Sequence, residues 1–233
     1  MEQTLKITNV LSDPTRYYIY QYISNRHQEV TVQEIADQFN IHPNVARLHL
    51  SKLEDVNMLV SETKKTGKGG RPSRLYRLSD DVIQLSFPFR DYQLLSKIAI
   101  ESMLAFGEEG KKALYTTGKK FGSEIITQEV KRLPDSANEM TFEQKLNIMK
   151  NAATIAGFYP EFEINEDHSK IYFQIFNCPF KELAKDHTES VCNMHFQFLK
   201  GMFDSLFDSA ELIEKENMIS GCNSCSYQVT VTK

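Results

Sequence analysis

The sequence predicts an α+β protein of two domains, and three observations support this. Helical apolar spacing with helix-start signals occupies the first part of the chain, and short β-rich runs follow it. Further along, long helical patterns accompany runs that alternate between apolar and polar residues, as strands do. The charge also changes: residues 1–90 carry 12 Lys/Arg against 10 Asp/Glu, whereas residues 91–233 carry 15 against 21. A chain of 233 residues can bury a core in each of two domains.

Three helices are expected at the start of the chain. Apolar residues recur with helical spacing over residues 5–25, and Ser12-Asp13-Pro14 divides this stretch with an N-cap and an N1 proline. The third helix occupies residues 31–40, because Thr31 followed by Glu34 has the spacing of a capping box.

A fourth helix follows after a turn of only two residues, Asn40 and Ile41. It begins at His42-Pro43 and carries an apolar stripe made of Ala46, Leu50 and Leu53. Two helices joined by so tight a turn form a helix-turn-helix.

A β-hairpin with a basic tip is expected next. The β-rich runs 58–62 and 74–80 flank the segment KKTGKGGRPSR (residues 64–74), which holds five cations, three glycines and no acid. A hairpin in this position turns a helix-turn-helix into a winged helix-turn-helix domain over residues 1–80.

This arrangement predicts contacts with double-stranded DNA. Asn44 and Arg47 face outward on the fourth helix and suit the edges of adenine and guanine, with Ser51 on the same face. His42 and Pro43 lie at the helix N-terminus, which suits a phosphate, and Lys52 is also expected to meet a phosphate. The expected wing contacts to the DNA backbone are Lys64, Lys65, Lys68, Arg71 and Arg74. The alternative for the wing is an ordinary solvated charge run.

A second α+β domain, expected to sense a signal and to dimerise, occupies residues 94–233. Residues 81–93 form a linker that loses helical periodicity and contains a proline. The expected helices lie at 91–106, 111–133, 141–157 and 181–207, and the expected strands at 158–165 and 170–177 and in two short terminal runs, one of them 226–232.

Three segments resemble a known family: LSDPTR (11–16), EIADQFNIHPNVARLHLSKLEDVNMLV (34–60) and GRPSRLYRLS (70–79). They look like the winged-helix regulators of the ArsR-like superfamily, in the branch of the Suf repressor, which controls iron–sulfur cluster biosynthesis. The resemblance implies a homodimeric transcriptional regulator that acts as a repressor. A dimer with two recognition helices is expected to bind a pseudo-palindromic operator.

The four cysteines, Cys178, Cys192, Cys222 and Cys225, all lie in the last 56 residues. Thiolates are preferred ligands of zinc and of iron–sulfur clusters, so the clustering predicts a metal site. The Suf-repressor pattern has cysteines similar to three of these, but its remaining cysteine falls in a stretch, residues 208–219, where this chain has none. The fourth ligand is therefore Cys222 or His195, or the site is incomplete.

The cofactor expected from this set is an iron–sulfur cluster, [4Fe-4S] or [2Fe-2S], that controls operator binding. The alternative is a structural zinc ion in a regulator that responds to a small molecule. A third reading, a thiol oxidoreductase based on Cys222-x-x-Cys225, lacks the strand-to-helix context of such enzymes, so no enzyme is expected. No apolar run approaches the ~20 residues of a membrane span and no signal peptide is evident, which predicts a cytoplasmic protein without a membrane partner.

Overall fold

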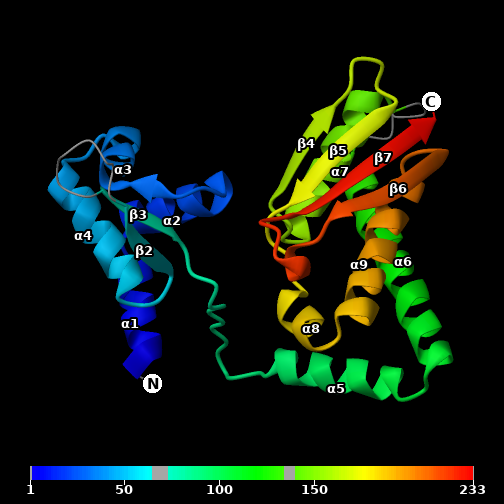
Figure 1. Ribbon diagram of the computed structural model, residues 1–233, viewed down its shortest axis with the longest axis horizontal. Coiled ribbons are helices and arrows are strands. Elements are labelled where there is room, and N and C mark those ends of the chain that lie inside the picture. Colours follow the sequence, from blue (N-terminus) through cyan, green and yellow to red (C-terminus); the bar gives the residue numbers. More distant parts are fainter. Residues whose placement is uncertain (1, 65–72, 134–139, 233) are drawn as a thin grey trace. The chain divides into compact units, whose positions relative to one another are not determined.

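The computed structural model describes residues 2–64, 73–133 and 140–232. The chain divides into two compact units, Met1–Arg90 and Asp91–Lys233, which are drawn in Figure 1. The first unit is a helix-turn-helix domain, and the second combines a four-stranded sheet with helices. The predicted α+β class is confirmed. Among the described residues, no helix is both long and apolar enough to cross a membrane.

The first unit contains four helices and a small sheet among its described residues. In chain order the elements are α1 (Glu2–Leu11), α2 (Pro14–Arg26), β1 (Val30–Thr31), α3 (Val32–Phe39), α4 (Pro43–Glu54), β2 (Leu59–Lys64) and β3 (Ser73–Leu78). The sheet is antiparallel with the order β1-β3-β2. The predicted stripe of α4 is fully buried in the core, together with residues of α2, α3 and β3. Strand β1 was not predicted, because two residues are too few to show an alternating pattern.

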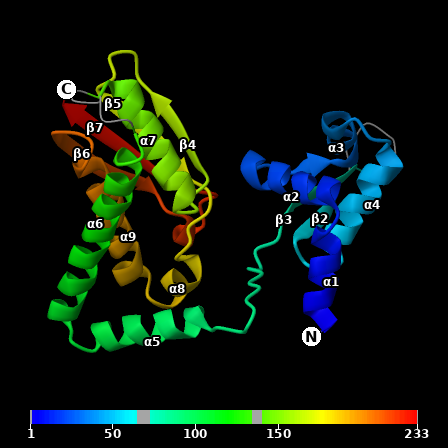
Figure 2. The same ribbon diagram turned by 180° about the vertical axis from the view of Figure 1, so that it is seen from behind.

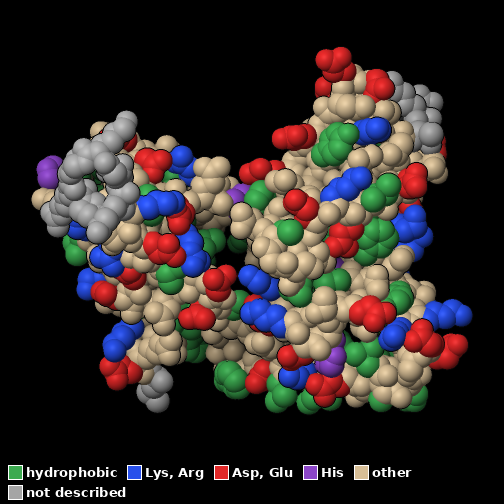
Figure 3. All heavy atoms as spheres, viewed as in Figure 1, with side chains coloured by type: hydrophobic (Ala, Val, Ile, Leu, Met, Phe, Trp, Pro, Cys, Tyr) green, Lys and Arg blue, Asp and Glu red, His purple; other side chains and the backbone are tan. Residues whose placement is uncertain are grey.

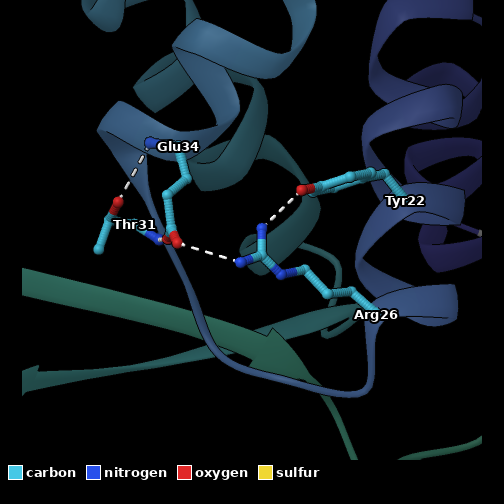
Figure 4. A network of polar contacts seen from close by, with 4 residues as sticks. All are labelled: Tyr22, Arg26, Thr31 and Glu34. Atoms are coloured by element: carbon cyan, nitrogen blue, oxygen red, sulfur yellow. Dashed lines mark hydrogen bonds and ion pairs between the residues drawn. The ribbon is translucent and has the colours of Figure 1, made fainter.

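A polar network holds the start of α3 (Figure 4). The Thr31 hydroxyl accepts a hydrogen bond from the Glu34 backbone N–H, and the Glu34 carboxylate accepts one from the Thr31 N–H. This is the predicted capping box. Arg26, at the end of α2, donates to the Tyr22 hydroxyl and to Glu34. The network therefore ties the first helix of the helix-turn-helix to α2.

The second unit is a sheet with helices on one face. Its described elements are α5 (Tyr92–Leu104), α6 (Glu108–Val130), α7 (Phe142–Ile155), β4 (Pro160–Ile164), β5 (Lys170–Ile175), α8 (Lys181–Asp186), α9 (Thr188–Asp204), β6 (Ser209–Glu216), the short 3-10 helix η1 (Met218–Ser220) and β7 (Cys225–Thr232). The strand order is β4-β5-β7-β6, with every pair antiparallel. Figure 2 shows α6, α7 and α9 covering one face of the sheet, where they form the main core.

The single helix predicted over residues 181–207 is wrong, because two helices occupy this stretch. α8 ends and α9 begins at His187, whose φ of −136° and ψ of 53° are not helical. Apolar spacing could not reveal the break, because both helices bury an apolar side and a one-residue interruption barely shifts the period.

Three glycines allow α6 and α9 to pack backbone against backbone. A Cβ atom on Gly122 would lie 1.9 Å from the carbonyl oxygen of Phe198, and one on Gly201 would lie 2.0 Å from that of Lys119. At Gly118 the corresponding distance to the Met194 carbonyl oxygen is 2.7 Å. No real Cβ occupies such positions, so the close approach of these helices requires glycine on both sides.

Candidate nucleic-acid interface and thiol cluster

The outward face of α4 carries the two residues predicted to read bases. Asn44 and Arg47 are both exposed, and the Arg47 guanidinium donates a 3.1 Å hydrogen bond to the Asn44 side-chain oxygen. Leu48, one turn beyond Asn44, is 54% exposed. Ser51 is half-buried and Lys52 exposed, with the Lys52 ammonium 3.7 Å from the Asp55 carboxylate. The helix thus presents amide, guanidinium and apolar groups on one accessible face, which is what readout in a major groove requires.

The N-terminus of α4 is capped from within the chain. Nδ1 of His42 accepts a hydrogen bond from the Asn44 N–H at 3.2 Å, and the His42 carbonyl accepts one from the Val45 N–H at 2.8 Å. Pro43 has no N–H to offer. A phosphate at this helix end would therefore have to displace the His42 imidazole.

The cations of the wing strands meet acids that are distant in sequence. Lys64 lies 3.5 Å from the carboxylate of Glu29. Arg74 donates to both carboxylate oxygens of Glu54, at 2.9 and 2.8 Å, and to the Ser61 hydroxyl. Because Glu54 is the last residue of α4, this contact joins the wing to α4, the second helix of the helix-turn-helix and its recognition helix. The other wing cations predicted to contact DNA, Lys65, Lys68 and Arg71, lie outside the described residues.

A hollow of about 550 Å³ lies between α4 and the wing. Its walls come from the starts of α3 and α4 and from strands β2 and β3, and its polar lining includes Thr31, Gln33, Arg47, Thr63 and Arg74. These residues place hydrogen-bond donors on both sides of the space between recognition helix and wing.

The inner side of α4 carries a buried histidine. His49 is 8% exposed, and its Nδ1 has no hydrogen-bond partner among the described atoms. Burial lowers the pKa of His49, an effect that the Asp13 carboxylate partly opposes. His49 is therefore neutral in the folded domain at neutral pH.

Acid is expected to destabilise the first unit through His49. In the unfolded chain its pKa returns to about 6.5, so between that value and the lower native pKa the unfolded state binds more protons. The unfolding free energy should then fall as the pH falls through this window. Thermal melts of the full chain and of His49→Gln across mildly acidic pH measure the effect. An identical pH dependence in both proteins would contradict it.

Three cysteines of the second unit gather where β5, α9 and β7 meet. Cys178 follows β5, Cys192 is in α9 and Cys225 begins β7, and Cys192 and Cys225 both act electrostatically on Cys178. Burial raises the pKa of Cys178 to about 12 and also raises those of Cys192 and Cys225. All three are neutral thiols. Cys222 is exposed in the loop before β7.

Two polar residues that were not predicted from the sequence, Asn217 and Glu214, also lie beside these thiols. The Asn217 side chain forms a hydrogen bond with Cys192 and donates another, at 2.7 Å, to Glu214. Glu214 acts electrostatically on both Cys192 and Cys225. In the register of β6 with β7, Glu214 pairs with Tyr227, which is buried against the helices. Glu214 itself is exposed, so the alternation of buried and exposed residues along β6 held no signal for its place beside the thiols.

His195 lies beside the thiols. Its Nδ1 is 3.6 Å from the Cys178 sulfur, and its ring packs between Phe158 and Phe180. Burial lowers the pKa of His195 to about 4. Its Nε2 is buried without a partner among the described atoms, so one imidazole nitrogen could still accept a ligand.

The cluster does not form a metal cage as it stands. Within the described ranges, no three residues of the His, Cys, Asp and Glu types are arranged to hold an ion, and all four cysteines are free. The donor types suit zinc or iron, but the buried thiols carry protons that a metal would have to displace.

Two family models match the chain. The model described as a helix-turn-helix domain matches residues 11–62, and the model described as Methanogen output domain 1 matches residues 106–230. The first agrees with the winged-helix part of the resemblance noted in the sequence, whereas neither is the Suf-repressor branch. The N-terminal domain is accordingly that of a DNA-binding transcriptional regulator. No curated protein matches the chain.

Two solved structures are similar to the chain at low identity. One is trafficking protein particle complex subunit 3 from Naegleria fowleri, covalently bound to palmitic acid. It is 14% identical with a TM-score of 0.43, over 60% of this chain and 97% of that one. The other is the phenol-responsive sensory domain of the transcription activator PoxR with phenol. It is 16% identical with a TM-score of 0.44, over 79% of this chain and 89% of that one.

Proposed function

The chain belongs to the Methanogen output domain 1 family, and on that premise we propose that it is a homodimeric repressor whose winged helix binds a pseudo-palindromic operator. The observation that supports this most is the outward face of α4. It offers Asn44 and Arg47 to solvent while its opposite face is locked into the core by Ala46, Leu50 and Leu53.

The proposed DNA contacts of α4 and the wing are of two kinds, those to base edges and those to phosphates. Arg47 can bond two acceptors of guanine and Asn44 can pair with adenine, while Leu48 suits the methyl group of thymine. The hydrogen bond between Arg47 and Asn44 holds these two side chains over the same helix turn in the absence of DNA. We expect Lys64, at the end of β2, to exchange its ion pair with Glu29 for one with a phosphate. Arg74, also expected to contact the DNA backbone, joins the wing to α4 through its hydrogen bonds with Glu54.

Direct binding to duplex DNA tests the function. The full chain should bind labelled duplex in fluorescence anisotropy titrations, and its affinity should fall linearly on a logarithmic plot as salt concentration rises. A net charge of −4 opposes non-specific attraction, so binding at moderate salt has to come from the local cations of the first unit. Absence of binding even at low salt would contradict the proposal.

The thiol cluster is our candidate for the control element. We propose that it binds an iron–sulfur cluster or zinc through Cys178, Cys192 and Cys225, with Cys222 or His195 as the fourth ligand. The gathering of three thiols from a loop, a helix and a strand, beside an imidazole whose Nε2 has no partner among the described atoms, supports this. No preformed cage exists among the described residues, so the thiols would have to move together and lose their protons to hold the metal.

Metal uptake should depend on these thiols and on pH. We expect protein purified without oxygen to contain iron and sulfide, and uptake to increase with pH because each thiol must lose a proton. Cys192→Ser should abolish uptake. Cys222→Ser and His195→Gln identify the fourth ligand by which of them reduces it. Zinc without sulfide would support the alternative site, and metal-free protein under all conditions would refute the metal proposal.

A further inference from the structure

Helix α5 contacts the rest of the second unit through its two charged residues and one buried apolar residue. Lys97 forms a 2.8 Å ion pair with Asp186, and Glu101 lies 3.8 Å from Nε2 of His187. These are the only charged residues in α5, and both point toward the α8 end of the unit. The one buried residue of the helix, Ile100, joins a small apolar cluster there.

The opposite side of α5 is apolar and open to solvent. The helical period places Leu94, Leu95 and Ile98 away from Ile100, and they are 53%, 60% and 53% exposed. Tyr92 is 66% exposed at the start of the helix, and Phe106 is 75% exposed just after its end. In Figure 3, hydrophobic side chains gather along the lower edge, where Figure 1 draws α5. The helix is thus inverted relative to an ordinary surface helix, which buries its apolar side.

The exposed apolar area of this side is at the upper end of the range for a monomer. Together the five side chains leave on the order of 600 Å² uncovered. The largest apolar patch on a typical monomer is about 300–600 Å², and a stable interface removes about 800 Å² from each partner. This surface alone therefore supplies most of what one side of a dimer interface needs.

We propose that the face formed by Tyr92, Leu94, Leu95, Ile98 and Phe106 binds the same face of a second copy of this chain. A two-fold interface requires a patch that complements itself, and an uncharged apolar helix face does so without any like-charge repulsion. Lys97 and Glu101 border this face, but Asp186 and His187 of the same unit engage them, so α5 offers a charged partner such as DNA no unpaired cation. The inference rests on the proposed function for its dimer, and it assigns the surface that forms it.

Light scattering on size-separated full-length protein tests the surface with a matched pair of variants. Ile98→Glu places a charge in the proposed interface, and Ile155→Glu places the same charge at the end of α7 on a residue that is 56% exposed. Wild type and Ile155→Glu should show twice the 26.9 kDa chain mass at micromolar concentration. Ile98→Glu should weaken dimerisation by about 100-fold or more and run as a monomer. Equal far-ultraviolet circular dichroism of the two variants shows that both are folded.

The results of this experiment distinguish a failure of the proposed dimer interface from a failure of the proposed DNA-binding function. A wild-type monomer, or an Ile98→Glu variant that remains dimeric, overturns the inference, even if the chain binds DNA. A monomeric Ile98→Glu beside dimeric controls supports it, even if none of them binds DNA, in which case only the proposed function fails.

Discussion

Replacing Gly122 with alanine is expected to destabilise the second unit by about 3 kcal/mol or more. In an isolated helix the same change would be stabilising by about 1 kcal/mol, because alanine is the better helix former. Here the added Cβ would lie 1.9 Å from the carbonyl oxygen and 2.8 Å from the carbonyl carbon of Phe198. Both atoms are backbone of α9, so the clash can be relieved only by moving one helix away from the other.

Urea denaturation followed by circular dichroism measures this effect. Thr117→Ala is the matched control, because Thr117 is in the same helix and is exposed. It should change the unfolding free energy by less than about 0.5 kcal/mol. Gly201→Ala, which approaches Lys119 from the other helix, should be as damaging as Gly122→Ala. A Gly122→Ala protein as stable as wild type would contradict the described packing of α6 and α9.

A large loss of DNA sequence discrimination is expected when Arg47 is replaced. Its replacement by alanine should reduce discrimination between operator and random duplex by about 10- to 100-fold, since a bidentate contact to guanine contributes about 1–3 kcal/mol of discrimination. Affinity for random duplex should change much less. The fold of the domain should survive, because Arg47 is exposed and its described contact is to the Asn44 side chain.

Lys64→Ala is the control for charge alone. It also removes one exposed cation, but from the wing. It should weaken binding to all sequences alike and reduce the salt slope by about 1. If Arg47→Ala behaved in the same way, Arg47 would contact phosphate only, and the assignment of α4 as the base-reading helix would lose its main support.

Local signals explain why the first unit was predictable. The capping box of Thr31 and Glu34, the N1 prolines and the buried stripe of α4 all act within one or two helix turns, and a sequence pattern records such short-range rules directly. Contacts between distant segments leave no such record. The pairing of Arg74 with Glu54 and the break at His187 could be found only in the folded chain.

The second unit shows the same contrast. Its strands and most helices follow from alternating apolar and polar residues and from helical apolar spacing. The glycines of α6, by contrast, have no evident role in the sequence, because their role depends on the contact with α9. The cysteines were recognisable as a group because of their residue type and clustering. The place of Glu214 and Asn217 among them was not, because it depends on how β6 pairs with β7.

Selection of bound duplexes from a random library by the full-length protein tests directly whether this chain reads DNA sequence through α4. Wild-type protein should enrich one pseudo-palindromic sequence, with half-sites separated by about one helical turn, and Arg47→Ala should lose that enrichment. Bound duplexes that remain random, or the same enriched sequence with Arg47→Ala as with wild type, would contradict sequence readout through α4.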